Sequence, residues 1–300
     1  MPAASMTARA TCRCRPASAR SSPTSPAPNA ISAAPTDAAM LCHRRGFLAL
    51  PGGFAVAAFW TRAQAATTLP SERLPRLVAA YPDHLASVEG DHLVWRDGTR
   101  QPTGAASPER PFEQMLRDAS IADQLRQTYE RGPPAGPPPL NHSPGRLRNT
   151  AFFTRMYGDC RQAAFARSLT SVTWMPKTRP QRLQVTGVND VARRLEQVIG
   201  DLESMPDRFK AYLVPSAGTY NCRPVADTGL MSMHGFGTAI DINVERSDYW
   251  AWANRRGQIA YRNRIPYEIA AVFEAHGFIW GGKWYHFDTM HFEYRPELLA

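Results

Sequence analysis

The chain has 300 residues, of which 43% are hydrophobic and 20% are charged, enough for one sizeable domain or two small ones. The formal net charge is +9, but residues 1–65 hold seven Arg and one Asp, so the remaining residues carry a net charge of only +3. Because the chain also has no basic-aromatic motif, we expect no nucleic-acid partner.

Residues 1–65 have the pattern of a leader followed by an export signal peptide. Residues 1–39 are rich in Ala, Ser, Pro and Thr, and such a segment cannot bury enough apolar surface to order itself. A different pattern opens at Met40, which we interpret as the natural start. A basic pair at residues 44–45 precedes an apolar run that ends at Trp60, and a small-x-small site follows at residues 63–65. This order is typical of a cleaved signal, and the Arg pair resembles a twin-arginine signal.

The alternative for this segment is an uncleaved membrane anchor. The apolar run is about 14 residues long, whereas a helix needs roughly 20 to span a bilayer. We therefore expect a mature chain that begins near Ala66, is periplasmic or secreted, and has no stable membrane insertion after cleavage. Of the five Cys, Cys160 and Cys222 belong to the mature chain. In an oxidising compartment they could form one disulfide; the alternative is two unrelated buried thiols.

Residues 66–140 are expected to form an N-terminal region followed by a linker. Residues 92–99 predict a strand that runs into an Asp-Gly turn. Residues 111–130 have helical spacing. Residues 132–139 are almost entirely Pro and Gly, which excludes a helix or a central strand and predicts a stiff linker. A separate compact domain is expected over residues 141–300.

The elements predicted within residues 141–300 indicate an α+β fold. Apolar residues between 188 and 202 recur at offsets of 3, 7, 10, 11 and 14, which is one stripe of an amphipathic helix. A second helix is bounded by Pro266 and Gly277. Strands are predicted at residues 212–214, 238–244 and 290–294. Because strands and helices do not alternate regularly, we expect a small antiparallel sheet with flanking helices.

The predicted strand at residues 238–244 carries an unexpected acid. Ile240 and Ile242 alternate with Asp241, so the carboxylate lies on the face opposite the isoleucines. A carboxylate on a covered face is costly unless it has a partner. Gly235 and Gly237 allow a sharp approach to the strand, so that His234 can lie beside Asp241. Ser232 is a candidate for orienting His234 or a substrate.

A second set of polar residues lies near the C-terminus. Two Gly and two Trp within residues 280–284 suit a tight turn that borders a cleft. His291 and Glu293 alternate with apolar neighbours and share the polar face of the last predicted strand. Asp288 has the wrong parity to share that face, so it is expected to project from the turn before the strand. That position suits a base that lies near a metal ion without binding it.

These residues match the needs of a catalytic zinc ion, Zn²⁺. Such a site takes three protein ligands from His and carboxylate groups and leaves the fourth position for water, whose pKa the metal lowers to about 7. A nearby carboxylate then moves the proton. His234, Asp241 and His291 supply the ligands, and Asp288 supplies the base. Glu293 and His286 are rival candidates for proton transfer, although Glu293 suits the orientation of a ligand better. The chain contains no H-E-x-x-H motif, so the site is not built on one helix.

Together these motifs resemble the family of zinc D-Ala-D-Ala carboxypeptidases and L-alanyl-D-glutamate peptidases, in particular its endolysin-like subgroup. The resemblance covers roughly residues 205–297, with looser likeness back to about residue 145. It implies that His234, Asp241 and His291 are the zinc ligands and that Asp288 is the general base. It also implies that Arg223, in a Cys-Arg-Pro segment, binds the substrate carboxylate or the developing oxyanion. The implied fold is the small α+β type of Hedgehog proteins and D,D-peptidases.

The function implied by the resemblance is hydrolysis of a peptide bond in peptidoglycan stem peptides or their precursors, by a monomer acting as a D,D-carboxypeptidase or an L,D-endopeptidase. Two alternatives stay open, a non-catalytic zinc-containing module that binds the cell wall and an ordinary secreted protease. Asp288 favours catalysis, because a binding module needs no base. The chain has no G-x-S-x-G motif and hence no case for a serine nucleophile.

Overall fold

The computed structural model describes residues 69–300, with the exception of residues 227 and 256. The predicted leader, export signal and small-x-small site all lie outside the described residues. Within the described part of the chain, no helix is both long enough and apolar enough to cross a membrane.

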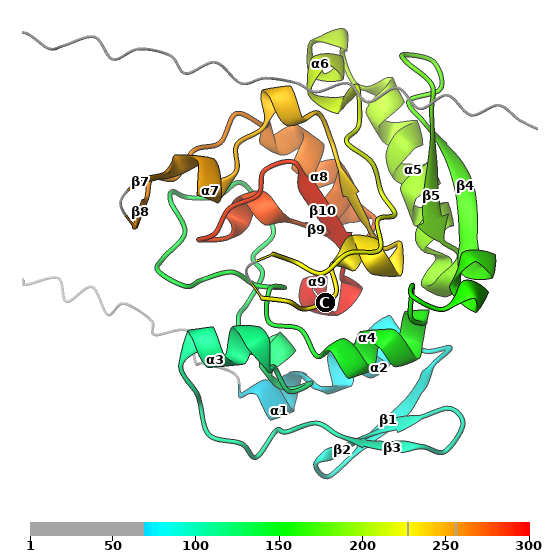
Figure 1. Ribbon diagram of the computed structural model, residues 1–300, viewed down its shortest axis with the longest axis vertical. Coiled ribbons are helices and arrows are strands. Elements are labelled where there is room, and N and C mark those ends of the chain that lie inside the picture. The colour runs from blue at the N-terminus through cyan, green and yellow to red at the C-terminus, as the bar shows by residue number, and fades with distance from the viewer. Residues whose placement is uncertain (1–68, 227, 256) are drawn as a thin grey trace, which may run out of the picture. The chain divides into compact units, whose positions relative to one another are not determined.

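The N-terminal part of the described chain consists of two short helices, α1 (Pro70–Arg73) and α2 (Pro75–Ala80), and a three-stranded antiparallel sheet (Figure 1). Its strands are β1 (Leu85–Glu89), β2 (His92–Trp95) and β3 (Arg100–Pro102). The predicted strand and its Asp-Gly turn are confirmed, since β2 pairs with β3 around Gly98, whose φ of 83° is one that glycine adopts readily.

The helix expected over residues 111–130 is shorter than predicted. Helix α3 covers Phe112–Arg117, and a 3-10 turn covers Asp123–Leu125. Between them, the amide of Ser120 donates to the carboxylate of Asp123, and the amide of Asp123 donates to the hydroxyl of Ser120. These side chains satisfy the backbone locally and compete with continuous helical hydrogen bonding.

The N-terminal segment contributes to the same hydrophobic core as the rest of the described chain. Leu77 and Leu93 belong to one buried cluster with Trp280 and Phe292. The Pro-rich residues that follow are held against the body of the protein, because the amide of Gly132 donates to the hydroxyl of Tyr267 at 2.8 Å. The predicted boundaries at residues 65 and 140 stay predictions.

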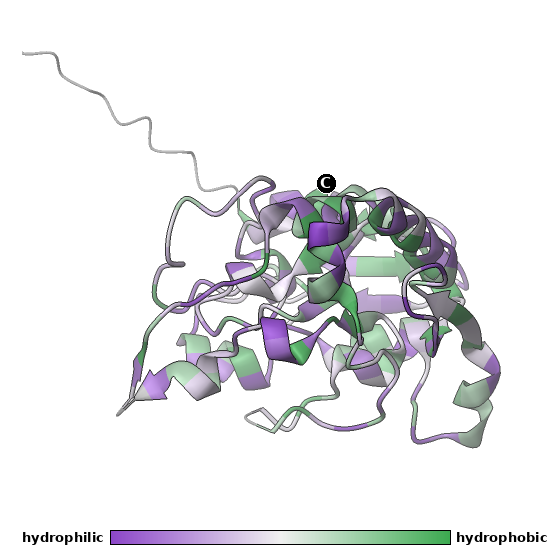
Figure 2. Cartoon of the chain, turned by 90° about the horizontal axis from the view of Figure 1, so that it is seen from above, coloured by the Kyte–Doolittle hydropathy of each residue, from purple (hydrophilic) through white to green (hydrophobic). Residues whose placement is uncertain are grey.

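The centre of the molecule is a three-stranded antiparallel sheet in the order β6 (Ala239–Asp241), β10 (His291–Tyr294) and β9 (Phe278–Trp280). The predicted helices are confirmed as α5 (Val191–Ser204) and α8 (Tyr267–Ala275). Helix α8 packs against β9, and α5 packs against α8 and against the hairpin of β4 (Leu169–Trp174) and β5 (Gln181–Thr186). Figure 2 shows green and purple residues alternating along the helices, as expected for elements with one buried side. This mixture of helices and small antiparallel sheets is α+β, as predicted.

Shorter elements complete the described chain. They are α4 (Thr150–Tyr157), α6 (Lys210–Leu213), α7 (Trp250–Ala253), the strand pair β7 (Asn254–Arg255) and β8 (Gln258–Ile259), α9 (Pro296–Leu299), and several 3-10 turns. The strand expected at residues 212–214 is wrong, because α6 covers most of it. A three-residue apolar run cannot distinguish a strand from a buried helical turn. Here the ammonium of Lys210 donates to the carbonyls of Leu202 and Glu203, which holds the turn against the end of α5.

A disulfide joins Cys160 to Cys222, with 5.7 Å between their Cα atoms, as the sequence predicted. Cys160 follows α4, and Cys222 lies in the loop that precedes β6. The bridge therefore ties the loop that carries Arg223 to the helical part of the core.

Candidate metal centre

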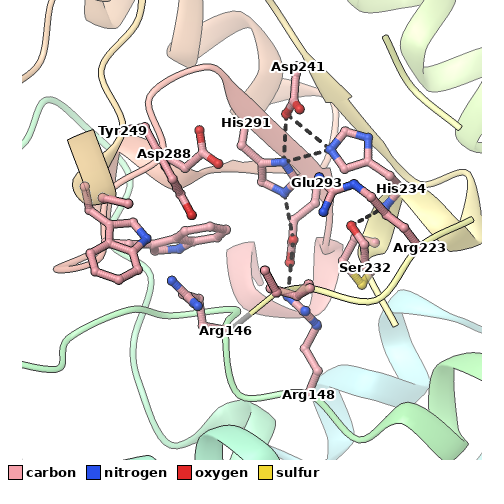
Figure 3. A pocket seen from close by; sticks show the side chains of 16 residues that line it. Arg146, Arg148, Arg223, Ser232, His234, Asp241, Tyr249, Asp288, His291 and Glu293 are labelled. Carbon is pink, nitrogen blue, oxygen red and sulfur yellow. Dashed lines mark hydrogen bonds and ion pairs between the residues drawn. The ribbon is translucent and has the colours of Figure 1, made fainter. Parts of the chain in front are cut away.

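Three potential metal ligands converge at the edge where β6 meets β10. Asp241 ends β6 and His291 begins β10, and the antiparallel register places these two residues directly opposite each other. His234 comes from the 3-10 turn Met233–Phe236 that leads into β6. His234, Asp241 and His291 form the group that we call the ligand triad (Figure 3).

The turn that carries His234 is held by its two ends. The hydroxyl of Ser232 caps its start by accepting from the amide of His234 at 3.3 Å. Gly237 ends the turn with φ of 69°, and its amide donates to the carbonyl of His234 at 3.0 Å. A side chain at Gly237 would lie 2.9 Å from the backbone nitrogen of Thr186. Glycine is therefore required here both for the backbone conformation and for the close approach of β5.

Hydrogen bonds determine which nitrogen of each of the two imidazoles faces Asp241. Nδ1 of His234 is bonded to the carbonyl of Thr219, which leaves Nε2 to face Asp241. Nε2 of His291 lies 3.0 Å from the carboxylate of Glu293, which leaves Nδ1 to face Asp241. In both cases the outer nitrogen donates to an oxygen, and this arrangement orients a ligating imidazole.

The three inward atoms fit a tetrahedral metal ion. His234 Nε2 lies 3.2 Å from His291 Nδ1 and 3.2 Å from Asp241 Oδ1, and His291 Nδ1 lies 3.0 Å from the same oxygen. Ligands about 2.0–2.1 Å from a tetrahedral zinc ion are about 3.3 Å apart. With the outer nitrogens protonated, each inward atom presents a lone pair, and three such donors are stabilised by one shared cation.

The charges of the triad stabilise one another. Burial would raise the pKa of Asp241, but the charges of His234 and His291 and their hydrogen bonds hold it well below its usual range. Burial would lower the pKa of His291, but hydrogen bonds to Asp241 and Glu293 raise it to about 10. The carboxylate thus stays ionised, and a metal ion that binds here would take the place of the proton on the inward nitrogen of His291.

Asp288 lies in the turn before β10, where the sequence placed it. Its Oδ1 atom is buried and has no hydrogen-bond partner among the described residues. Burial, together with the negative charge of Asp241, raises the pKa of Asp288 to about 7. The turn needs Gly281, because a side chain there would lie 2.5 Å from the carbonyl oxygen of Asp288. A carboxyl group with this pKa can accept and release a proton near neutral pH.

A cleft of about 430 Å³ contains the ligand triad and Asp288. Its charged lining also includes Glu293, Arg223, Arg146 and Arg148 (Figure 3). Arg223 is exposed at the cleft, on the loop tied down by the disulfide.

Of the two rival bases, Glu293 lies behind His291 as a hydrogen-bond partner, which suits orientation of the ligand. His286 is not among the described residues that line the cleft; its ring lies 6.2 Å from that of Phe112 and 5.0 Å from that of Trp250.

Arg146 and Arg148 were not singled out from the sequence. They lie in the segment that follows the Pro-rich stretch, far along the chain from the two motifs. The one available signal was their position on both sides of Leu147, which predicts that they share a side of an extended segment. Such a pattern does not say what the shared side faces, because that depends on where the segment packs.

Comparison with known proteins covers only part of the chain. Residues 226–294 match the family model described as D-alanyl-D-alanine carboxypeptidase. The matched segment contains the ligand triad and Asp288, whereas Arg146, Arg148 and Arg223 lie outside it. No curated protein and no solved structure matches the chain. The match therefore supports a peptidase related to the zinc D-alanyl-D-alanine carboxypeptidases.

Proposed function

We propose that this protein is an exported zinc peptidase that hydrolyses a peptide bond in peptidoglycan stem peptides or their precursors, as a D,D-carboxypeptidase or an L,D-endopeptidase. The observation that carries the proposal is the ligand triad, whose three inward atoms lie 3.0–3.2 Å apart in a cleft that also contains Asp288. The match of residues 226–294 to a D-alanyl-D-alanine carboxypeptidase model supports this reaction class.

His234, Asp241 and His291 would hold the zinc ion through two nitrogens and one oxygen, a common donor set for catalytic zinc. When bound, the ion would polarise the scissile carbonyl and lower the pKa of a water molecule. Glu293 would keep His291 in the tautomer that ligates through Nδ1. Thr219 would do the same for His234 through its backbone carbonyl.

Asp288 would act as the general base and then as the general acid. Its carboxylate would take a proton from the attacking water and return it to the leaving amine, and its position in the same cleft as the ligand triad supports this role. Its buried Oδ1, which has no partner among the described residues, is available for this proton. Arg223 would bind the substrate carboxylate or the negative charge that develops on the carbonyl oxygen, and a guanidinium group suits either task.

Export is supported by the disulfide between Cys160 and Cys222, because disulfides persist mainly in oxidising compartments. The substrate proposed here, the cell-wall peptide, is found in the same compartment. We propose that the protein acts there as a monomer.

The decisive experiment is a digest of purified muropeptides, with products identified by mass, in the presence of zinc and again with a chelator. We expect cleavage with zinc, loss of cleavage with the chelator, and recovery when zinc is restored. Casein is the control substrate. Cleavage of casein in place of muropeptides would indicate an ordinary secreted protease, and binding to cell wall without any product would indicate a non-catalytic module.

A further inference from the structure

Two buried arginines line the cleft from a segment that lies outside the matched residues. Arg146 and Arg148 are each only 9% exposed, and both border the cleft that contains the ligand triad (Figure 3). Leu147 between them is 1% exposed and belongs to a small apolar cluster with residues of α3. The segment therefore presents its leucine to the core and its two cations to the cleft.

The backbone of this segment is fixed by contacts with distant parts of the chain. The indole of Trp284 donates to the carbonyl of Pro144 at 2.6 Å, and Arg295 donates to the carbonyl of Gly145 at 2.9 Å. Gly145 has φ of 101°, and a side chain there would lie 2.4 Å from Ile279 of the central sheet. Because the segment is already held in place, little conformational entropy is lost when its arginines bind a ligand.

The charge balance of the cleft favours an anionic ligand. Three guanidinium groups and three carboxyl groups line it, namely those of Arg146, Arg148, Arg223, Asp241, Asp288 and Glu293. A divalent cation held by the triad adds two positive charges to this balanced set. The loaded cleft thus carries excess positive charge, and guanidinium groups bind carboxylates with paired, charge-assisted hydrogen bonds.

We propose that Arg146 and Arg148 form a carboxylate-binding subsite that recognises a carboxylate of the peptide substrate away from the bond that is cut. This inference rests on the proposed function and deepens it, because it assigns to the substrate a required negative charge. The charge comes either from the C-terminal carboxylate of the peptide or from the carboxylate of an acidic residue within it. Arg148 also lies 3.9 Å from Glu293, which contacts His291. Arg146 is the position to test, and because its charge also acts on Asp288, binding is measured in a protein that lacks this carboxylate.

The test uses the full chain with zinc and three synthetic stem peptides that end in D-Ala-D-Ala. One carries all its carboxylates, one has a C-terminal amide, and one has the free carboxylate of its D-Glu converted to an amide. Binding is measured by calorimetry in an Asp288→Asn background, and KM and kcat are measured with Asp288 present. The variants are Arg146→Gln, the conservative Arg146→Lys, and the control Arg179→Gln, at an exposed position between β4 and β5.

We expect the otherwise unchanged protein to bind one of the two amidated peptides roughly tenfold or more weakly than the fully charged peptide. Arg146→Gln should bind the charged peptide as weakly as the amidated one in the Asp288→Asn background, and with Asp288 present its KM should rise. Arg146→Lys should recover part of the preference, and Arg179→Gln should keep all of it. Thermal unfolding checks that each variant is folded. If Arg146→Gln does not fold, Arg146→Lys still tests the subsite.

An Arg146→Gln protein that keeps the full preference for the carboxylate would overturn the subsite. Cleavage that depends on neither carboxylate would also overturn it, while leaving the proposed function intact. Conversely, a carboxylate preference in binding that Arg146→Gln removes, without cleavage of any peptide, would support the subsite and refute the peptidase. The absence of both binding and cleavage would refute both.

Discussion

A buried chain of hydrogen bonds connects Tyr81, the residue after helix α2, to the ligand triad, and its central residue is Arg295. Arg295 is fully buried and donates to Glu297 at 2.6 Å and to Glu293 at 3.0 Å. Beyond Glu297, the hydroxyl of Tyr81 completes the chain at 2.6 Å, and beyond Glu293 lies His291. We predict that Arg295→Leu strongly destabilises the fold and also weakens zinc binding.

The size of the effect follows from the two carboxylates that this substitution leaves behind. Glu293 and Glu297 are each 0% exposed, and removal of one partner from a buried ion pair costs about 3–5 kcal/mol. For a domain of this size, that loss lowers the melting temperature by roughly 6–20 °C. Because Glu293 orients His291, its displacement should also reduce zinc affinity by about 10–100-fold.

Thermal unfolding followed by circular dichroism measures the first effect, and competition with a chromogenic zinc chelator measures the second. Arg179→Leu is the matched control, since this exposed arginine should change the unfolding free energy by less than about 0.5 kcal/mol. An Arg295→Leu protein that melts within a degree of the wild type and binds zinc equally well would refute the reasoning. It would mean that the two glutamates are stable in the core without this cation.

Four further outcomes are expected. Asp288→Ala should keep stoichiometric zinc, measured by metal analysis, and reduce kcat by about 10²–10⁴-fold. Full activity of this variant would refute the assignment of Asp288 as the general base. His291→Ala should lose zinc, so a variant with stoichiometric metal would contradict the ligand assignment. Gly145→Ala should cost roughly 1–3 kcal/mol in urea unfolding, because its φ of 101° disfavours a side chain. Burial raises the pKa of Glu293, but His291, Arg148 and Arg295 lower it to about 2. Its stabilising contribution should therefore be present above pH about 4.3 and be lost as the pH falls towards 2; urea unfolding that does not vary over this range would contradict it.

Local patterns in the sequence were sufficient for several elements. The stripe of apolar residues predicted α5, and the Pro and Gly limits predicted α8. Alternation placed Asp241 opposite the buried side chains of Ile240, in β6, and Ile242, which follows it. Failures came where a local pattern was short or was interrupted by side-chain hydrogen bonds. The three-residue run at 212–214 belongs mainly to a helix, and Asp123 with Ser120 ends the predicted helix early.

What the sequence determined by itself is the set of candidate ligands and the side of each strand on which they lie, because side-chain direction follows from strand period alone. The strand period also placed Glu293 on the same face as His291, which it orients. Only the tertiary structure decided which nitrogen of His234 faces inward, because the backbone carbonyl of Thr219 binds the other nitrogen. It also brought Arg146 and Arg148 to the cleft, through the packing of Gly145 against the central sheet. The contacts of His234 with Thr219 and of Gly145 with Ile279 join residues far apart in the chain, and no period along the sequence encodes them.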